Sequence, residues 1–279
     1  METGATAVDQ KGREDRTLGR IGGLEVALAG SQAELDASFA LRFAVFHHEF
    51  GALNDPVSVS TGQDRDHFDA FCDHLIVIDT ERALPIENQI VGTYRLLPHD
   101  KAQQTGFYSA QEFTVQALVD RHPARRFLEL GRSCVLPPYR GRRTIELLWQ
   151  GIWAYCRRHS IDVMMGCASF GGTERKEFQQ GLSFLHHFAA SEKEWSVDAQ
   201  GPTAFSTDLL PADHIEQKRA LAELPPLIKG YLRLGAHFAT SALIDEAFKS
   251  IDVFVTLPIE NISQRYITHY GQDAQRFAA

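Results

Sequence analysis

One acidic and one basic side chain stand close together near the middle of the chain. Residues 127–135 read Phe-Leu-Glu-Leu-Gly-Arg-Ser-Cys-Val, with Glu129 and Arg132 on either side of Gly131. This run predicts a strand, and glycine inside a strand often marks a bulge. A bulge at Gly131 would shift the side-chain alternation, so Glu129 and Arg132 could share one face. The segment therefore predicts a carboxylate and a guanidinium at a common site.

The next segment predicts a turn that opens into a helix. Residues 137–144 read Pro-Pro-Tyr-Arg-Gly-Arg-Arg-Thr. A helix N-terminus binds phosphate through its free N–H groups and the helix dipole. Together, the two segments are typical of acyl transfer from a thioester carrier that bears a phosphate.

The composition is that of an ordinary globular protein. The chain has 279 residues, of which 44% are hydrophobic and 23% charged, enough for one large or two small domains. No apolar run is long enough for a membrane-spanning helix or resembles a signal peptide. We expect a disordered lead-in over residues 1–23 and a single domain with a C-terminal extension over residues 24–279. Four widely spaced cysteines favour buried thiols in a reducing cytoplasm.

Charge is distributed unevenly along the chain. The formal net charge is −8, yet residues 121–158 hold nine arginines and two glutamates, a local net charge of +7. Such a stretch can be a solvated face or a docking patch for an anionic partner. Nucleic acid is disfavoured as that partner, because the chain is acidic overall and carries no known motif.

The hydrophobic pattern predicts an α/β fold. Strands are expected over residues 24–29, 74–79, 89–97, 127–135, 162–169 and 251–257. Helices are expected over residues 31–48, 144–159 and 174–188, with a helical hairpin or turn from residue 224. The strand at 162–169 is almost continuously apolar, which is typical of a central strand. On the first helix, Arg42 falls on the apolar face, where an arginine usually has a buried partner or a ligand.

Six segments in order resemble those of the ornithine N-alpha-acyltransferases, bacterial GNAT-like acyltransferases that make lyso-ornithine lipid. They cover most of residues 25–260 and are Leu41-Arg-Phe-Ala-Val-Phe46, Asp64-Arg-Asp-His-Phe-Asp69, Gly92-Thr-Tyr-Arg-Leu-Leu97, Glu129-Leu-Gly-Arg-Ser133, Tyr139-Arg-Gly-Arg-Arg143 and Leu224-Pro-Pro-Leu-Ile-Lys-Gly-Tyr-Leu-Arg-Leu-Gly-Ala236. The resemblance implies a GNAT-like fold, with a mixed, mostly antiparallel central sheet flanked by helices. It also implies that strands 127–135 and 162–169 splay apart to admit a pantetheine arm.

The first four segments also resemble those of the acyl-homoserine-lactone synthases, which acylate the amine of a small amino-acid-like substrate. That resemblance implies acceptor-binding roles for Arg42, Phe46, Asp66, Asp69 and Arg95. Arg42 and Arg95 could each hold the substrate carboxylate or form a structural salt bridge. Asp66 and Asp69 could bind the cationic amine or simply be solvated at the surface.

The phosphate-binding turn departs from the usual GNAT loop. Only its central Gly141 is retained, and a bulky Arg143 stands where a small residue lets the pyrophosphate of coenzyme A approach. This departure favours the single phosphate of phosphopantetheine on acyl carrier protein, with no cofactor bound to the enzyme itself. The residues assigned to this contact are Arg140, Gly141, Arg142, Arg143 and Thr144.

Amide formation from a thioester needs a neutral amine and stabilisation of a tetrahedral oxyanion. Glu129 could take the proton from the α-ammonium, or form an ion pair with Arg132 or Arg95. Backbone N–H groups at Ser133 and Cys134 could face the oxyanion. A nucleophilic Cys134 is conceivable, but without a neighbouring histidine a packed thiol is favoured. No metal site is expected, because adjacent histidines on a helix point in different directions.

Taken with these resemblances, the sequence favours a cytoplasmic enzyme that moves an acyl chain from acyl carrier protein to the α-amine of L-ornithine. The resemblance alone implies the 3-hydroxyl group of that chain and ornithine as the acceptor. The alternatives are an acyl-homoserine-lactone-synthase-like enzyme and a non-catalytic module that binds acyl carriers or lipid surfaces. The apolar block over residues 224–236, with Lys229 and Arg233 as its charges, could rest on an anionic membrane. Packing of this block as core beneath the sheet is the favoured alternative.

Overall fold

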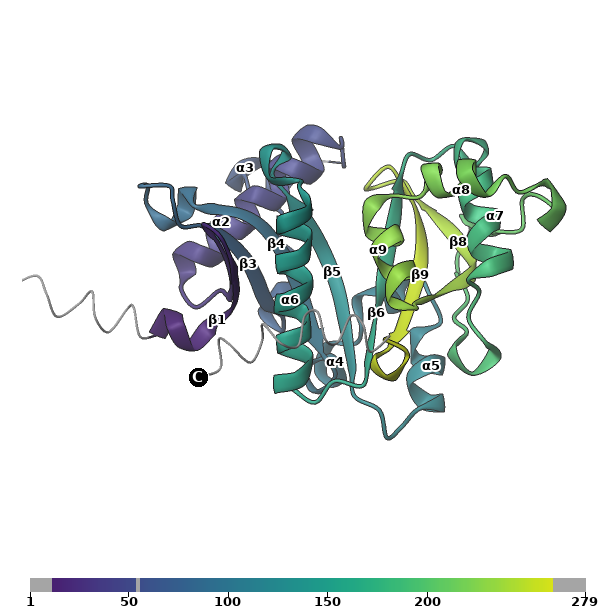
Figure 1. Ribbon diagram of the computed structural model, residues 1–279, viewed down its shortest axis with the longest axis horizontal. Coiled ribbons are helices and arrows are strands. Elements are labelled where there is room, and N and C mark those ends of the chain that lie inside the picture. Colours follow the sequence, from purple (N-terminus) through teal and green to yellow (C-terminus); the bar gives the residue numbers. More distant parts are fainter. Residues whose placement is uncertain (1–11, 54–55, 263–279) are drawn as a thin grey trace, which may run out of the picture.

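The computed structural model describes residues 12–53 and 56–262. Their strands form one nine-stranded sheet in the order β1-β2-β3-β4-β5-β6-β9-β8-β7 (Figure 1). The strands span β1 Thr17–Ile21, β2 Leu24–Leu28, β3 Asp73–Asp79, β4 Ile90–Pro98, β5 Phe127–Val135, β6 Val163–Gly171, β7 Ala204–Ser206, β8 His237–Asp245 and β9 Ser250–Pro258. Only β5 and β6 run parallel to each other, which confirms the expected mixed, mostly antiparallel sheet.

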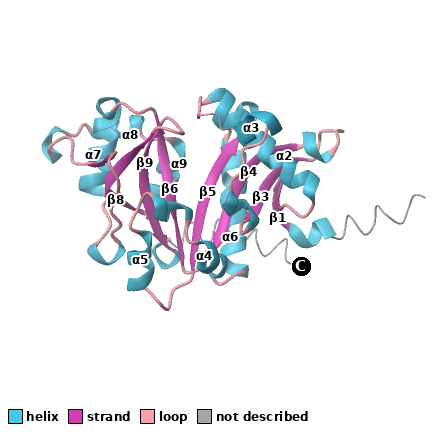
Figure 2. Ribbon diagram, turned by 180° about the vertical axis from the view of Figure 1, so that it is seen from behind, coloured by secondary structure: helices cyan, strands magenta, loops and turns pink. Residues whose placement is uncertain are grey.

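The helices connect these strands and cover both faces of the sheet (Figure 2). The α-helices span α2 Gln32–Phe43, α3 Pro56–Thr61, α4 His99–Thr105, α5 Val115–Arg121, α6 Arg142–Arg158, α7 Gln179–Phe188, α8 Gln217–Glu223 and α9 Pro226–Leu234. Short 3-10 turns join many of them, and a π-helical segment, Ala44–Glu49, prolongs α2. A capping box formed by Ser31 and Glu34 starts α2.

Alternating side chains divide the core between the two faces of the sheet. On one face, α6, α7 and α9 pack on residues such as Tyr94, Leu128 and Leu130. On the other face, Phe127, Met165 and Phe254 pack beneath α5 and the loops around it. The α2 helix covers β3 and β4 on this second face. The central strands are thus buried from both sides, in keeping with their apolar sequences.

The two central parallel strands separate soon after they begin. Pairing between β5 and β6 extends only from Phe127 with Val163 to Glu129 with Met165. Beyond that point β6 keeps pairing with β9 as far as Gly171, while β5 stays with β4. Figure 1 shows β5 and β6 close at one end and diverging toward the other. The splayed pair implied by the resemblance is therefore present.

One expectation about the chain's periphery was wrong and another was confirmed. The lead-in expected over residues 1–23 contains β1, which pairs with β2 through a two-residue glycine turn at Gly22 and Gly23. Residues 1–11 lie outside the described part of the chain. For residues 224–236 the favoured alternative is confirmed, because Leu224, Ile228 and Tyr231 are buried in the core beneath the sheet. Contact of this block with a membrane stays a prediction.

Candidate active site

A cavity of about 700 Å³ lies where β5 and β6 separate. Its wall includes Tyr94, Leu130 and Ala168, which belong to the apolar core on the α9 side of the sheet. It also includes Glu129 and Cys167, which alternate to the opposite face. The cavity therefore reaches both faces of the sheet and is apolar toward α9 and polar on the other side.

Glu129 lies in the polar wall of this cavity. Its two carboxylate oxygens accept hydrogen bonds from the backbone N–H groups of Tyr108 at 2.7 Å and Ser109 at 2.8 Å. The Ser109 hydroxyl donates a third. Burial raises the pKa of Glu129 above its ordinary value, while the bonds from Ser109 and Tyr108 oppose that shift. A carboxylate offers about four acceptor sites, so a donor from substrate can still be accommodated.

The expected bulge follows Gly131. Thr93 on β4 pairs with Cys134 on β5, whereas Arg95, two residues on, pairs with Gly131. Two residues of β5, Arg132 and Ser133, thus stand opposite one residue of β4. Arg132 adopts a positive φ of 50°, and like Glu129 it lines the cavity. The bulge therefore brings the carboxylate and the guanidinium to a common site, as the sequence predicted.

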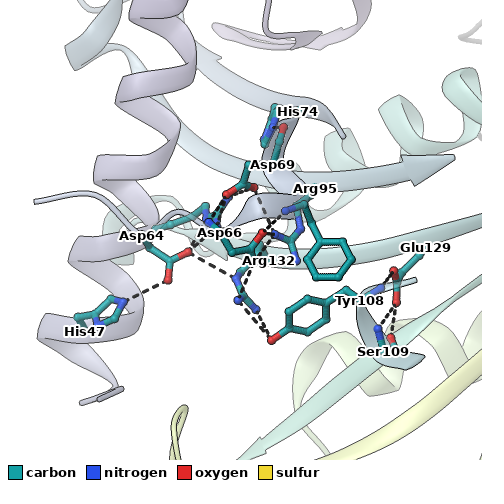
Figure 3. A network of polar contacts seen from close by, with 12 residues as sticks. His47, Asp64, Asp66, Asp69, His74, Arg95, Tyr108, Ser109, Glu129 and Arg132 are labelled. Carbon is teal, nitrogen blue, oxygen red and sulfur yellow. Dashed lines mark hydrogen bonds and ion pairs between the residues drawn. The ribbon is translucent and has the colours of Figure 1, made fainter. Parts of the chain in front are cut away.

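Three arginines and three aspartates form a network beside the cavity (Figure 3). Arg42 is fully buried and binds Asp64 through Nε at 2.8 Å and Asp69 through Nη1 at 2.7 Å. Arg95 binds Asp66 at 2.7 Å, and Arg132 contacts the same carboxylate at 3.2 Å. His47 also contacts Asp64 at 3.1 Å. The network ties α2, the loop before β3, and strands β4 and β5 into one unit.

Electrostatics keeps Asp64 and Asp69 ionised. Burial opposes their charge, but the neighbouring guanidinium of Arg42 outweighs it and lowers the pKa of Asp69 to about 2. The pKa of Asp64 is lowered too, by Arg42 and Arg132 against its desolvation. The arginines remain protonated in turn, with the pKa of Arg132 raised by Tyr108 and the aspartates against desolvation. The network is therefore a permanent array of charges at neutral pH.

Of the residues expected to bind the acceptor, two line the cavity and three do not. Phe46 and Arg95 contribute to its wall. Arg42 is instead buried against Asp64 and Asp69, so the structural salt bridge is what the chain forms. Asp66 forms a salt bridge with Arg95, and Asp69 forms one with Arg42. Arg42, Asp66 and Asp69 therefore lie in the network that holds Arg95 and Arg132 in place, outside the residues that line the cavity, and the acceptor contacts expected of them stay predictions.

The residues expected to be catalytic divide in the same way. Glu129, Arg132 and Ser133 line the cavity. Cys134 lies outside it, in the apolar cluster beneath α2, and burial raises the pKa of its thiol. A buried thiol with a raised pKa is a poor nucleophile, so a packed cysteine is the better description of this residue.

The turn before α6 stands at the rim of the cavity. Arg140 binds Glu49 in a bidentate ion pair, with N–O distances of 2.5 and 2.6 Å, and Glu49 lines the cavity. Gly141 is the N-cap of α6, and Arg142 is exposed, with Glu146 as a partner at 2.6 Å. Arg143 is also exposed. Thr144 is 2% exposed, so its hydroxyl is turned away from any solvent-borne phosphate.

Several residues of the site lacked a local signal in the sequence. Tyr108 and Ser109 belong to a short 3-10 turn, yet they hold Glu129 in place. Tyr94 lines the cavity, and its hydroxyl lies 3.1 Å from that of Tyr231 on α9. Asp252 lines it from β9. The alternation of side chains along β4 and β9 could have indicated that Tyr94 and Asp252 point inward. It could not have indicated that the two side chains line the same cavity.

Two groups of side chains in the described residues have a composition suited to metal binding. One is His186, His187 and Asp208 near α7, and the other is Glu112, Cys167 and Asp252 at the cavity. In the first group, the ring of His186 contacts the hydroxyl of Thr207 at 3.1 Å, and the ring of His187 contacts the carbonyl of Leu210 at 3.0 Å.

Across the described residues, no helix is long and apolar enough to cross a membrane.

Part of the chain matches a known family model, and solved structures of similar fold exist. Residues 41–150 match the family model described as the acetyltransferase (GNAT) domain, a segment that includes Glu129 and the start of α6. Among solved structures, FeeM, an N-acyl amino acid synthase from uncultured soil microbes, is similar, with a TM-score of 0.49 and 9% sequence identity. The similarity covers 85% of this chain and 91% of that one.

Closer relatives share nearly the whole chain. A protein of Brucella abortus named L-ornithine N(alpha)-acyltransferase is 54% identical over 261 residues, covering 93% of each chain. A protein of the same name from Rhizobium meliloti is 52% identical, covering 94% of this chain and 89% of its own. Identity at this level over this length, together with the splayed strands and the cavity between them, shows that the chain is an acyltransferase and belongs to the family of L-ornithine N(alpha)-acyltransferases.

Proposed function

We propose that this enzyme transfers an acyl chain from acyl carrier protein to the α-amine of L-ornithine. The product would be lyso-ornithine lipid, and we take the acyl chain to be 3-hydroxylated. The single observation that carries the proposal is the cavity between β5 and β6 with Glu129 in its wall. A pantetheine arm is a narrow, extended chain, and strands that have stopped pairing leave room and free backbone groups for it. The names of the relatives supply the acceptor.

The reaction can be written with the residues of the cavity. Glu129 accepts a proton from the α-ammonium of ornithine, directly or through water, and frees the nitrogen lone pair. The nitrogen attacks the thioester carbonyl carbon, and the negative charge that develops on oxygen is stabilised beside Arg132 and the bulge at Ser133. The carbon–sulfur bond then breaks, and the pantetheine thiolate leaves and takes up a proton.

The ion-pair network gives Arg132 a fixed position for this task. Its guanidinium lies between Tyr108 and Phe248, with the guanidinium carbon 4.8 and 4.5 Å from the two ring centroids. Asp64 and Asp66 hold its charged end at 3.4 and 3.2 Å. An arginine that is held on several sides needs little reorganisation when charge develops nearby. We therefore assign Arg132 to the oxyanion and Arg95 to the carboxylate of ornithine.

Acyl carrier protein is proposed as the donor because of the turn before α6. Arg142 and Arg143 are exposed there, one turn from the rim formed by Glu49 and Arg140. Their position at this rim sets them apart from the rest of the basic stretch, and a partner does not exclude docking, since Arg142 binds Glu146 at 2.6 Å. The docking surface is accordingly the N-terminal end of α6 rather than the whole stretch. All four cysteines are free thiols, in line with work in the cytoplasm.

The proposal is tested by comparing donors and by reversing one charge. Purified enzyme is given 3-hydroxyacyl chains on acyl carrier protein or on coenzyme A, with L-ornithine, and N-acyl ornithine is measured by mass spectrometry. We expect the carrier-bound chain to be preferred. Arg143→Glu should raise the KM for the carrier at low salt. Arg158→Glu, an exposed arginine at the far end of α6, is the matched control. Equal use of coenzyme A, or equal effects of the two variants, would refute the carrier assignment.

A further inference from the structure

A second group of carboxylates stands in and behind the cavity wall, away from the ion-pair network. Asp252 on β9 is 7% exposed and lines the cavity. Glu112 approaches it from the loop before α5, so that Glu112, Cys167 and Asp252 bring ligand atoms within 4.8 Å of one another. These residues come from three separate parts of the chain and converge beside Ser169, the pairing partner of Asp252 on β6.

These carboxylates differ from the aspartates of the network in forming no salt bridge within the described residues, although Arg132 is near enough to influence both. Within the described residues, no lysine, arginine or histidine forms a salt bridge with Asp252 or Glu112. The partners of Asp252 are hydroxyls, with Ser250 donating to it at 2.8 Å and Ser169 contributing a second bond. Asp64, Asp66 and Asp69 each have an arginine. A buried carboxylate that faces a cavity without a counter-ion is suited to a cationic ligand.

The charge of this group is costly in the empty cavity. Burial, together with the nearby Asp245, raises the pKa of Asp252 to about 6. Burial and the charges of Asp252 and Asp245 raise the pKa of Glu112 to about 7. A bound ammonium group would offset both the desolvation and the repulsion.

The strand register separates this group from Glu129. Glu129 pairs with Met165 on β6, whereas Asp252 pairs with Ser169. The two pairing positions are four residues apart along β6, which is about 13 Å at the usual strand rise. The side chains of Glu129 and Asp252 therefore start from separate positions along the cavity. A substrate with one amine at each end of a short chain can place one at each.

We propose that Asp252, supported by Glu112, binds the side-chain ammonium of the acceptor and thereby selects a diamino acid. This inference rests on the proposed function, because it assigns Glu129 to the α-amine that is acylated. The carboxylate pair would hold the distal amine away from the thioester, so acylation takes place at the α-amine. Specificity then arises from a buried charge that a neutral side chain would leave unpaired.

The test compares L-ornithine with L-norvaline, which has the same carbon skeleton without the distal amine. The measured quantity is the ratio of kcat/KM for ornithine to kcat/KM for norvaline, with one acyl donor. In Asp252→Asn we expect this ratio to fall about 10- to 100-fold, mainly through the KM for ornithine, because a hydrogen bond to a charged group is lost. The KM for the donor should stay unchanged. Glu246→Gln, an exposed residue on the same hairpin outside the cavity wall, should leave the ratio as it is.

The possible outcomes separate this inference from the function on which it rests. A folded Asp252→Asn enzyme with wild-type selectivity overturns the inference. If circular dichroism shows that Asp252→Asn does not fold, Glu112→Gln is measured instead. We expect the same loss of selectivity in Glu112→Gln, and unchanged selectivity would overturn the proposal. Loss of ornithine turnover on chelation, restored by Zn²⁺, would assign the group to a metal and also overturn it. A wild-type enzyme that acylates neither amino acid from any thioester refutes the proposed function instead.

Discussion

The backbone carbonyl of Leu130 on β5 occupies the space that a side chain on Gly166 of β6 would need. A Cβ at position 166 would lie closer than 3.0 Å to that oxygen, and the φ of Gly166 is 153°. The two residues come directly after the last paired position of the two strands, Glu129 with Met165. A close backbone contact that only glycine permits therefore marks the point where the strands part.

Gly166→Ala should disturb this point and destabilise the protein. The added methyl group meets backbone rather than a movable side chain, and the φ value is strained for alanine. We expect the free energy of unfolding to fall by about 2–4 kcal/mol in urea titrations. Gly171→Ala on the same strand is the control, because its Cβ would meet no atom within 4 Å. Equal stability of the two variants would contradict the steric argument.

Glu129→Gln should slow the acyl transfer step by about 100-fold or more, because it removes the base while preserving size. Burial raises the pKa of Glu129, and a general base acts only when deprotonated. The wild-type rate should therefore fall as the pH drops through a pKa above the ordinary glutamate value. This acidic limb of the pH–rate profile should be absent in Glu129→Gln. The measurement is the dependence of kcat/KM on pH for both proteins, with circular dichroism to confirm that the variant folds. A fully active Glu129→Gln variant would exclude the assignment of Glu129 as the base.

The sequence predicted the core of the site through local patterns. An apolar run with one glycine indicated β5 and its bulge, and so the shared location of Glu129 and Arg132. The splayed strands came from resemblance rather than from pattern. By contrast, β8 and the short β7 were missed, because turns and polar residues interrupt the strand pattern there.

Charge pairing is the part that sequence could not predict. Arg42 and Asp64 are 22 residues apart and meet only because the loop before β3 folds back across α2. Asp252 and Glu112 meet through the pairing of β6 with β9 and the placement of a loop, and they have no common motif. Which carboxylate is neutralised and which remains available for a ligand depends on the path of the whole chain. The sequence therefore could not indicate that Asp64, Asp66 and Asp69 pair with arginines, whereas Asp252 and Glu112 form no salt bridge within the described residues.

Asp69→Asn should be strongly destabilising, because it breaks a buried network. Arg42 would lose one of its two carboxylates while remaining fully buried, and removing one partner of such a pair typically costs about 3–5 kcal/mol. Since the pKa of Asp69 is lowered to about 2, its contribution is complete above pH 4. It should diminish as the pH falls from about 4 toward 2. Urea unfolding of Asp69→Asn and of Asp36→Asn, an exposed residue on α2, should differ by that amount at pH 7.

Asp252→Asn should have the opposite effect on stability. The folded-state pKa of Asp252 is raised to about 6 from an ordinary value of 3.8, so its charge destabilises the folded protein above pH 6. Asparagine removes that charge and still accepts the hydrogen bond from Ser250. We expect a gain of about 1–3 kcal/mol in the free energy of unfolding at pH 8. The gain should shrink as the pH falls from 6 to 4, where both proteins are neutral at this position. Without ligand, urea titrations at pH 8 and pH 5 make the comparison. A variant that is less stable than wild type at pH 8 would mean that the Asp252 carboxylate stabilises the fold. It would contradict the view that the charge of Asp252 destabilises the fold and is kept for a cationic substrate.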